Sequence, residues 1–508
     1  MIKVVIILII LAGLGNLFST DFKNFTDELK DESISAVEAF QKLYDFCAYQ
    51  EITKGEFSIF KNEINDTLTA YSQLWISKKY NVSKETPLIV FLHGGISTKD
   101  FVLEKELLEY AQNNVLWNKL KEENYIFLFP TGKMGYTWWE KGGMENIRSQ
   151  IWLLKQRYNI DDNKIYLTGI SDGGSGSYHF ALNQPDDFAC FLPMIGMLGV
   201  GSMVNQKPVF ISNLQNREIY ATNTDKDGLY PAANMRKIVD LMQTAGANIL
   251  YKEFWDLGHT ASYLENEVLY QIGFINSQIR NPFSANIYWE TADLDYGKCD
   301  WLEITAIDTT KTKKDWHIFH NRTLLSTKLR FGFYNDREWE NEGVKVTKIV
   351  EESVAEKCGL LVDDIIIGFD EYSIKGIDEL VEFRDTKKKN GDKFTLKVQR
   401  KGKDIVLKGQ FSEAEEFTVV IEGKQSGAVK ARYYGNKFVL ETSQIESINL
   451  YLHPQMVNFE NPVIVEVNGI ELFNHKVKYD KDFLLENFSH NYDRKALWVN
   501  KIELKIDE

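Results

Sequence analysis

A serine enclosed by glycines is the residue whose surroundings point most directly to chemistry. It lies in the run Gly169-Ile-Ser-Asp-Gly-Gly174, between a predicted strand over 164–168 and a predicted helix. Glycines on both sides remove side chains that would clash in a sharp strand-to-helix turn. The amides at the start of the helix favour negative charge beside the serine. We therefore expect Ser171 to be an exposed nucleophile.

A serine nucleophile needs a base and an acid that orients the base. His259 follows the predicted strand over 249–254 and is the predicted base. His179 is its rival, but it falls on the predicted helix after the serine, where a packed or capping side chain is expected. The predicted groups follow one another along the chain in the order Ser, Asp, His, each at a strand end. This is the order in which the partners of a GxSxG serine are found.

Two aspartates, Asp225 and Asp227, follow the predicted strand over 217–221. The acid is predicted to be Asp227, because Asp227-Gly-Leu-Tyr-Pro231 places it just before a predicted helix that starts at proline. Asp225 remains the alternative.

Two backbone amides are needed to stabilise a developing oxyanion. One is predicted to be that of Asp172, directly after the serine. The other is predicted in the loop His93-Gly94-Gly95, which follows the apolar run over 88–92. In this interpretation His93 shapes the loop and is not the base.

Paired tryptophans, Trp138 and Trp139, lie beyond the second predicted strand, at the same edge of the sheet. Ligands bind at the carboxyl edge of such sheets, so these side chains could line a substrate pocket. Packing under a loop is the alternative interpretation.

The elements that must position these residues alternate between strands and helices. Continuous apolar runs over 87–92 and 125–129 are typical of strands buried on both faces of a parallel sheet. An antiparallel strand pair is predicted between Gly55 and Ile76, and helical spacing is found over 144–158 and 231–244. The sequence therefore predicts an α/β domain with a mainly parallel sheet over about 50–280.

These motifs together resemble the α/β-hydrolase esterases of the feruloyl-esterase, polyhydroxyalkanoate-depolymerase and dienelactone-hydrolase-like group. The resemblance covers 55–280 and rests on Pro87–Gly95, Gly169–Gly174, Asp227–Pro231 and Gly258-His259. It implies an α/β-hydrolase fold with helices on both faces of the sheet, and hydrolysis through an acyl-enzyme. Prolyl-oligopeptidase-like peptidases share the same core, and these motifs do not separate the two groups.

A second stretch, residues 323–411, resembles a PDZ domain. Arg330-Phe331-Gly332-Phe333 is similar to the loop that binds a peptide carboxylate in that family, and Ser353–Leu360 is similar to its S-P-A-x-x-A-G-L segment. Val354, Cys358 and Asp363 depart from the family pattern but keep its apolar spacing. The resemblance implies binding of a C-terminal peptide by strand addition. A groove that packs internally is the alternative.

The remaining C-terminal sequence is mostly strand-like. Asn468-Gly469 between two apolar runs is a strong hairpin signal. We predict one β-sandwich from 284–322 and 412–508, into which the PDZ-like domain is inserted, with the hydrolase domain over 21–283.

The composition narrows the class of protein. The chain has 508 residues, with 59 Lys and Arg against 73 Asp and Glu, and a net charge of −14. Such a surface repels phosphate backbones, which argues against nucleic-acid binding. Residues 1–20 have a positive start and a short apolar run, which predicts a cleaved signal peptide and a secreted or periplasmic protein without a stable membrane span. The four cysteines are expected to be buried thiols, with disulfides, which export permits, as the alternative.

The sequence therefore predicts a secreted serine hydrolase that cleaves carboxylic esters without a cofactor or a metal site. Its expected partners are an ester or peptide substrate and a C-terminal peptide in the PDZ-like groove. An exported peptidase is the first alternative, and a non-catalytic binding or scaffold protein is the second.

Overall fold

The computed structural model describes residues 24–49, 52–102, 104–205, 208–320, 322–326, 329–336, 339–420 and 425–506. The predicted signal peptide, residues 1–20, lies outside this set. The chain divides into two compact units, one of Met1–Arg322 with Val419–Glu508 and the other of Thr323–Thr418. In the described part of the chain, no helix is both long enough and apolar enough to cross a bilayer.

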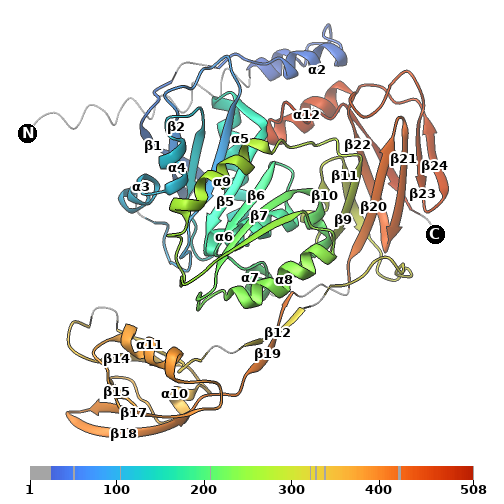
Figure 1. The fold of residues 1–508 in the computed structure, drawn as a ribbon. Coiled ribbons are helices and arrows are strands. Elements are labelled where there is room, and N and C mark those ends of the chain that lie inside the picture. The colour runs from blue at the N-terminus through green and yellow to red at the C-terminus, as the bar shows by residue number, and fades with distance from the viewer. Residues whose placement is uncertain are drawn as a thin grey trace, which may run out of the picture. The chain divides into compact units, whose positions relative to one another are not determined.

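An eight-stranded sheet forms the centre of the first unit (Figure 1). Its strands are β1 (Phe57–Asn65), β2 (Leu68–Ile76), β3 (Thr86–Leu92), β4 (Ile126–Pro130), β5 (Ile160–Ile170), β6 (Cys190–Met194), β7 (Glu218–Thr224) and β8 (Ile249–Phe254). They lie in the order β1-β2-β4-β3-β5-β6-β7-β8. Strand β2 runs antiparallel to β1 and β4, and the other neighbours are parallel. β3 and β4 are buried almost throughout, which is why their sequences are continuously apolar.

Helices cover both faces of this sheet (Figure 1). They are α3 (Glu104–Gln112), α4 (Val115–Leu120), α5 (Lys141–Arg157), α6 (Asp172–Asn183), α7 (Val200–Asn205), α8 (Ala232–Thr244) and α9 (Leu264–Ser277), with the 3₁₀ helix η1 (Ile211–Asn216). Side chains of α3, α4 and α9 share one apolar core with alternate residues of the strands, among them Phe91 and Phe129. Helix α6 packs on β3, β5 and β6. This is the α/β-hydrolase arrangement that the sequence predicts.

Two further sheets pack face to face in the same unit. Their strands are β9 (Asn286–Thr291), β10 (Lys298–Cys299), β11 (Leu302–Ile307), β20 (Gly427–Tyr434), β21 (Lys437–Ser443), β22 (Ile445–Leu452), β23 (Val463–Val467), β24 (Ile470–His475) and β25 (Asn500–Lys505), with the 3₁₀ helix η2 (Leu294–Tyr296). The orders are β24-β23-β21-β20-β9 and β10-β11-β22-β25. Both sheets contribute to one core that buries Trp289 and Trp301. Because β9 pairs with β20 and β11 with β22, strands from before and after the insertion build the sandwich together.

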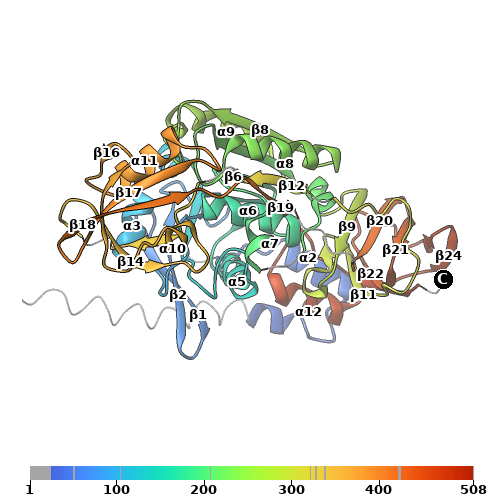
Figure 2. The ribbon, with the colours of Figure 1, turned by 90° about the horizontal axis from the view of Figure 1, so that it is seen from below.

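The N-terminal helix α2 (Ala36–Tyr44) lies against α12 (Lys481–Asn491), as Figures 1 and 2 show. Ala39 and Leu43 of α2 share a core with Leu484 and Phe488 of α12. The sequence pattern did not predict α12, although the Asp480 side chain caps it by accepting the amide of Phe483. Residues placed by prediction at the start of the hydrolase domain thus pack on the C-terminal segment.

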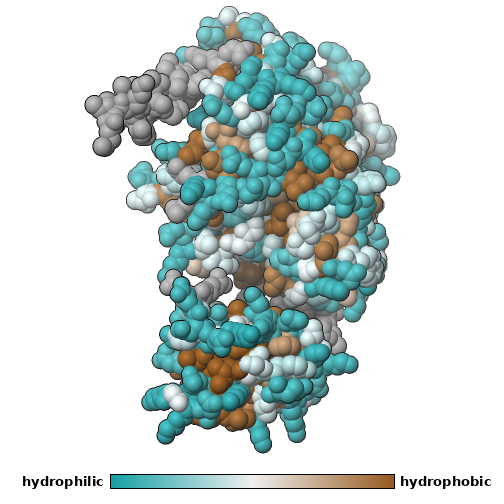
Figure 3. Space-filling view, turned by 60° about the vertical axis from the view of Figure 1, so that its left-hand side comes forward, coloured by the Kyte–Doolittle hydropathy of each residue, from teal (hydrophilic) through white to brown (hydrophobic). Residues whose placement is uncertain are grey.

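The second unit is a small sheet with two helices. Its elements are β13 (Phe333–Asn335), β14 (Val344–Ile349), β15 (Ile365–Phe369), β16 (Tyr372–Ser373), β17 (Lys393–Arg400), β18 (Lys403–Gln410), α10 (Val354–Lys357) and α11 (Ile377–Lys387). The sheet order is β13-β14-β15-β17-β18, with β16 paired to β15. At the ends of this segment, β12 (Arg322–Ser326) pairs with β19 (Glu415–Val420). Phe331, Phe369 and Phe394 form part of its core. Figure 3 shows apolar side chains that gather on the surface of this unit.

Candidate active site

The turn after β5 has the strained backbone that the glycine motif predicts. Ser171 has φ 59° and ψ −117°, and α6 begins at the next residue. A Cβ at Gly173 would lie 2.1 Å from the carbonyl oxygen of Leu92, and one at Gly174 would lie 2.5 Å from that of Met194. Only glycine fits at these two positions, so the close packing of α6 against β3 and β6 explains the motif. The turn leaves the Ser171 side chain partly exposed at the carboxyl edge of the sheet.

The structure brings Ser171, His259 and Asp227 into one hydrogen-bonded series. His259 Nε2 lies 2.8 Å from Ser171 Oγ, and His259 Nδ1 lies 2.8 Å from Asp227 Oδ2. Loops after β5, β8 and β7 supply the three side chains, and these parallel strands end at the same edge of the sheet. A carboxylate at Nδ1 keeps the proton on that nitrogen, so that Nε2 is free to accept one from the serine.

Asp227 is held in its ionised form by its neighbours. Its side chain is 2% exposed, and burial alone would raise the pKa of the carboxyl group. Hydrogen bonds from His259 and from the amides of Tyr230 and Leu229 outweigh burial, so the pKa lies below its usual value. The alternative acid, Asp225, accepts the amide of Leu257.

The rival base His179 does not take part in this series. It lies on α6 with 4% of its surface exposed, against Gly201 and Trp139. This burial agrees with the packed position that its place on the helix predicts.

The predicted oxyanion loop approaches the serine closely. A Cβ at Gly94 would lie 3.0 Å from Ser171 Cβ, and Gly95 has φ 70°. His93 is 6% exposed, and its Nε2 accepts the amide of Gly132, so Nδ1 carries the proton and donates to the Gly94 carbonyl at 2.7 Å. Burial lowers the pKa of His93, which keeps the ring neutral. His93 thus shapes the loop, and Gly94 of this loop lies close to Ser171.

The tryptophan pocket predicted from the sequence is wrong for Trp138. Its ring is fully buried, and its Nε1 donates to the His93 carbonyl at 2.9 Å. Gly176 of α6 leaves the room that this side chain fills, since a Cβ there would lie 2.3 Å from the Trp138 Cβ. Trp139 is 6% exposed and packs beside Gly201. Trp138 thus packs between the loop at His93 and α6, and both tryptophans offer a substrate almost no surface.

Sequence reasoning missed Tyr230 as a member of the site. Its ring meets the His259 imidazole edge-on, with the ring centroids 5.7 Å apart. Its hydroxyl donates to Asp172 Oδ1 at 3.4 Å. The signal was its place inside Asp227–Pro231, three residues after the acid, but nothing in the sequence indicates which way such a side chain turns.

The predicted carboxylate loop of the second unit directly precedes and begins β13. Gly332 has φ 82°, and a Cβ there would lie 2.3 Å from the Ser353 Cβ, so glycine is required. Phe331 is buried in the core while Arg330 is exposed. The carbonyls of Phe331 and Gly332 accept the amides of Ala355 and Val350 and fix the loop.

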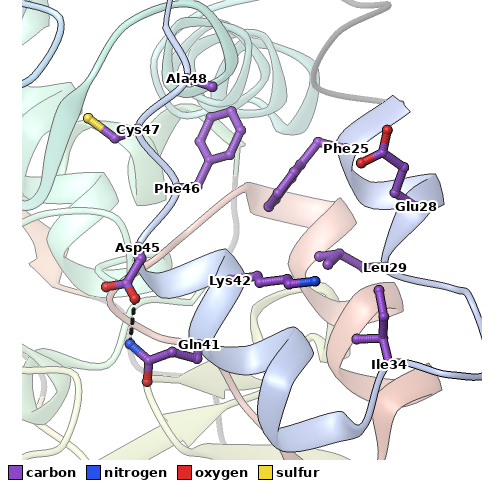
Figure 4. A pocket seen from close by; sticks show the side chains of 10 residues that line it. All are labelled: Phe25, Glu28, Leu29, Ile34, Gln41, Lys42, Asp45, Phe46, Cys47 and Ala48. Atoms are coloured by element: carbon purple, nitrogen blue, oxygen red, sulfur yellow. Dashed lines mark hydrogen bonds between the residues drawn. The ribbon is translucent and has the colours of Figure 1, made fainter.

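A cavity of about 470 Å³ lies beside α2, away from every predicted site residue (Figure 4). It is lined by Phe25, Glu28, Leu29, Ile34, Gln41, Lys42, Asp45, Phe46, Cys47 and Ala48. Cys47 is an exposed free thiol in an extended segment, which contradicts the prediction of a buried one, whereas Cys190, Cys299 and Cys358 are buried and free. Within the described ranges, no group of three His, Cys, Asp or Glu side chains is arranged to hold a metal ion.

Comparison with known proteins finds a family match in one part of the chain and a relative in another. The PDZ domain family matches residues 319–408. The bifunctional acetylxylan esterase/xylanase XynS20E of Neocallimastix patriciarum is 30% identical over 149 residues, which are 28% of this chain and 20% of that protein. The match therefore spans about a fifth of that relative's length.

Solved structures of esterases and other hydrolases overlap with part of the chain. A thermostable esterase has 23% identity and a TM-score of 0.37, over 44% of this chain and 63% of its own. A ferulic acid esterase has 14% identity and a TM-score of 0.35, over 43% and 98%. An S-formylglutathione hydrolase from Staphylococcus aureus has 15% identity and a TM-score of 0.33, over 44% and 98%. The strand order of the central sheet defines an α/β-hydrolase fold, and the chain combines it with a PDZ domain.

Proposed function

We propose that this protein is a secreted serine hydrolase that cleaves carboxylic esters through an acyl-enzyme. The observation that carries the proposal is the series Ser171–His259–Asp227, with both hydrogen bonds at 2.8 Å. In this mechanism His259 takes the proton of Ser171 as its oxygen attacks the ester carbonyl, and later gives it to the leaving alcohol. Water then hydrolyses the acyl-enzyme by the same route.

Negative charge on the carbonyl oxygen would be stabilised by amides beside the serine. The amide of Asp172 lies at the N-terminus of α6, and the Gly94-Gly95 loop approaches Ser171 from β3. Such donors act where charge develops and are held in place before the reaction begins. No cofactor is needed for these steps.

Ester substrates are favoured over peptides, and the curated relative guides the first choice among them. That protein is named as an acetylxylan esterase, so acetylated sugars are the first natural esters to try. Peptide hydrolysis is the alternative, because the same triad geometry serves both reactions.

The test is labelling of the full chain with a fluorophosphonate, followed by mass spectrometry of the adduct. We expect the label on Ser171 and none in Ser171→Ala. The labelling rate of His259→Ala should be at least about 10³-fold lower, because the serine then lacks its base. Ser83→Ala, which removes an exposed hydroxyl from the turn before β3, should label like the wild type. Mass spectrometry of the exported protein also gives its N-terminus, and we expect signal-peptide cleavage between Gly15 and Thr20.

Turnover of p-nitrophenyl esters against peptide p-nitroanilides then separates esterase from peptidase. Faster hydrolysis of the anilides would support the peptidase. A folded wild-type protein that neither labels nor turns over any substrate would contradict the hydrolase and favour a binding or scaffold protein.

We also propose that the second unit binds a C-terminal peptide. Support comes from the fixed loop at 330–333 and from β13, to which a peptide strand could add. Fluorescence anisotropy on the full chain should show that a peptide with a free, apolar C-terminal residue binds. The same peptide with a C-terminal amide should bind at least about tenfold more weakly, because the loop amides lose a charged acceptor. Equal affinity of both peptides would argue that this groove does not recognise a carboxylate.

A further inference from the structure

The side chain that follows the nucleophile contacts two loops of the site at once. Asp172 Oδ2 accepts the backbone amide of Ile96 at 3.1 Å, and Oδ1 accepts the hydroxyl of Tyr230 at 3.4 Å. Ile96 ends the oxyanion loop (residues 93–96), and Tyr230 ends the acid loop (residues 227–230). We propose that the Asp172 carboxylate is a positioning residue that holds both loops in register with Ser171, an inference that rests on the proposed hydrolase function.

The contact with Ile96 fixes the approach of the oxyanion loop. A Cβ at Gly94 would lie 3.0 Å from Ser171 Cβ, so the loop passes close to the serine. Contacts of His93 and Trp138 restrain the start of this loop, and Asp172 restrains its end beside the serine. The Ile96 amide, two residues beyond Gly94, donates to the Asp172 carboxylate. The backbone amide of the same Asp172 is the other predicted oxyanion donor. Asp172 thus fixes the position of its own amide relative to the predicted donors of the oxyanion loop.

The contact with Tyr230 extends the same restraint to the base. The Tyr230 amide donates to Asp227 Oδ1 at 2.9 Å, and its ring lies edge-on to His259. Burial, and then the charge of Asp172, raise the pKa of Tyr230 to about 12, so its hydroxyl stays a donor at neutral pH. The hydrogen bond from the Tyr230 hydroxyl to Asp172 therefore holds the Tyr230 ring against the His259 imidazole.

This arrangement predicts that loss of the Asp172 carboxylate weakens stabilisation of the transition state and leaves substrate binding nearly unchanged. The carboxylate lies beside the site and serves geometry, since both of its oxygens accept hydrogen bonds from the loops. Oxyanion donors act on charge that develops only as the tetrahedral intermediate forms. A displacement of about 1 Å in such groups can lower rates about 10²-fold.

The experiment compares kcat and KM for p-nitrophenyl acetate with the inhibition constant of phenylboronic acid, which forms a tetrahedral adduct with a serine. Asp172→Ala keeps the backbone amide but loses both loop contacts, so we expect kcat about 10- to 100-fold lower with KM within about twofold. The inhibition constant should rise by the same factor as kcat falls. Asp172→Asn should recover most of the loss, because its amide oxygen can accept from Ile96 and its nitrogen can donate to the Tyr230 oxygen.

Two further variants isolate the contacts. Tyr230→Phe removes one hydroxyl and should lower kcat about three- to tenfold, and combined with Asp172→Ala it should add nothing, because residues that act as a unit are not additive. Asp240→Ala removes an exposed carboxylate from α8 and is the matched control, expected to behave like the wild type.

The outcomes separate this inference from the proposed function. Wild-type kcat and boronate affinity in Asp172→Ala would overturn the inference and leave the hydrolase intact, whereas an inactive, unlabelled wild type would overturn both. A fall in kcat without a matching rise in the inhibition constant would also contradict it. If Asp172→Ala does not fold, unchanged kcat in Tyr230→Phe overturns the proposal, and the expected fall there supports it.

Discussion

Asp227→Asn should lower kcat for ester hydrolysis by about 10⁴-fold and leave KM nearly unchanged. Asp227 Oδ1 accepts the amides of Leu229 and Tyr230, while Oδ2 faces His259 Nδ1. In the variant the amide oxygen stays with the two backbone donors, so the amide nitrogen takes the place of Oδ2. That nitrogen donates to Nδ1 and stabilises the tautomer that carries its proton on Nε2. Such an imidazole cannot accept the proton of Ser171.

The matched control is Asp225→Asn, which removes the alternative acid. Asp225 Oδ1 accepts the Leu257 amide at 3.2 Å, a role that the asparagine oxygen can keep. Activity should therefore stay within about threefold of the wild type. Stopped-flow or steady-state assays with p-nitrophenyl acetate measure both variants. A large loss in Asp225→Asn with little in Asp227→Asn would assign the acid to Asp225.

The pH dependence of this acid follows from its lowered pKa. Because the pKa of folded Asp227 lies below the reference value of 3.8, the carboxylate is ionised at neutral pH and well into the acid range. Its contribution to folding is present above pH 3.8 and is lost as the pH falls through the folded pKa. Protonation of Asp227 should therefore contribute nothing to a loss of activity between pH 5 and 8, and the pH–rate profile of the wild type in that window measures this.

The parts of the site that the sequence predicts are those in which chemistry forces a local backbone shape. The need for glycine at 173 and 174 can be predicted, because a Cβ there would lie 2.1 and 2.5 Å from a neighbouring carbonyl oxygen. Strands β3 and β4 can be predicted from their continuous apolar sequences, because both faces of those strands are buried. In each case the constraint lies within a few residues of the signal that reveals it.

The parts that the sequence did not predict depend on partners far away in the chain. The sequence leaves open whether Trp138 lines a pocket or packs under a loop, and the packing depends on Gly176 and the His93 carbonyl beside it. The side chain of Tyr230 joins the site only because the Asp172 carboxylate lies within its reach. Helix α12 is buried against α2, more than 400 residues away in the chain, so its own local sequence gives a weak signal for it.

Asp493→Ala should lower the free energy of unfolding of the first unit by about 3–5 kcal/mol. Asp493 follows α12, is 2% exposed, and pairs with Arg280 at 2.7 Å and Lys155 at 3.9 Å. Both cations belong to the hydrolase part of the unit and are 3% exposed. Removing the carboxylate leaves the Arg280 guanidinium buried without this ion pair, and that desolvated charge is the source of the loss.

The pKa of Asp493 gives the sign of the accompanying pH effect. Burial raises it, but Arg280 and Lys155 lower it more, so the folded pKa is below the reference value of 3.8. The stabilisation is complete above pH 3.8 and disappears as the pH falls through the folded pKa. The difference in stability between wild type and Asp493→Ala should therefore be largest at neutral pH and shrink in acid.

Urea unfolding followed by tryptophan fluorescence measures this difference, since every tryptophan except Trp339 lies in the first unit. Asp493→Asn separates charge from shape, because its oxygen can still accept the amides of Lys495 and Ala496. Glu123→Ala breaks an exposed ion pair with Lys79 and is the control, expected to change stability far less. Wild-type stability in Asp493→Asn would contradict a role for the charge. A loss in both variants would show that the buried charge of Asp493, and not only its shape, stabilises the first unit.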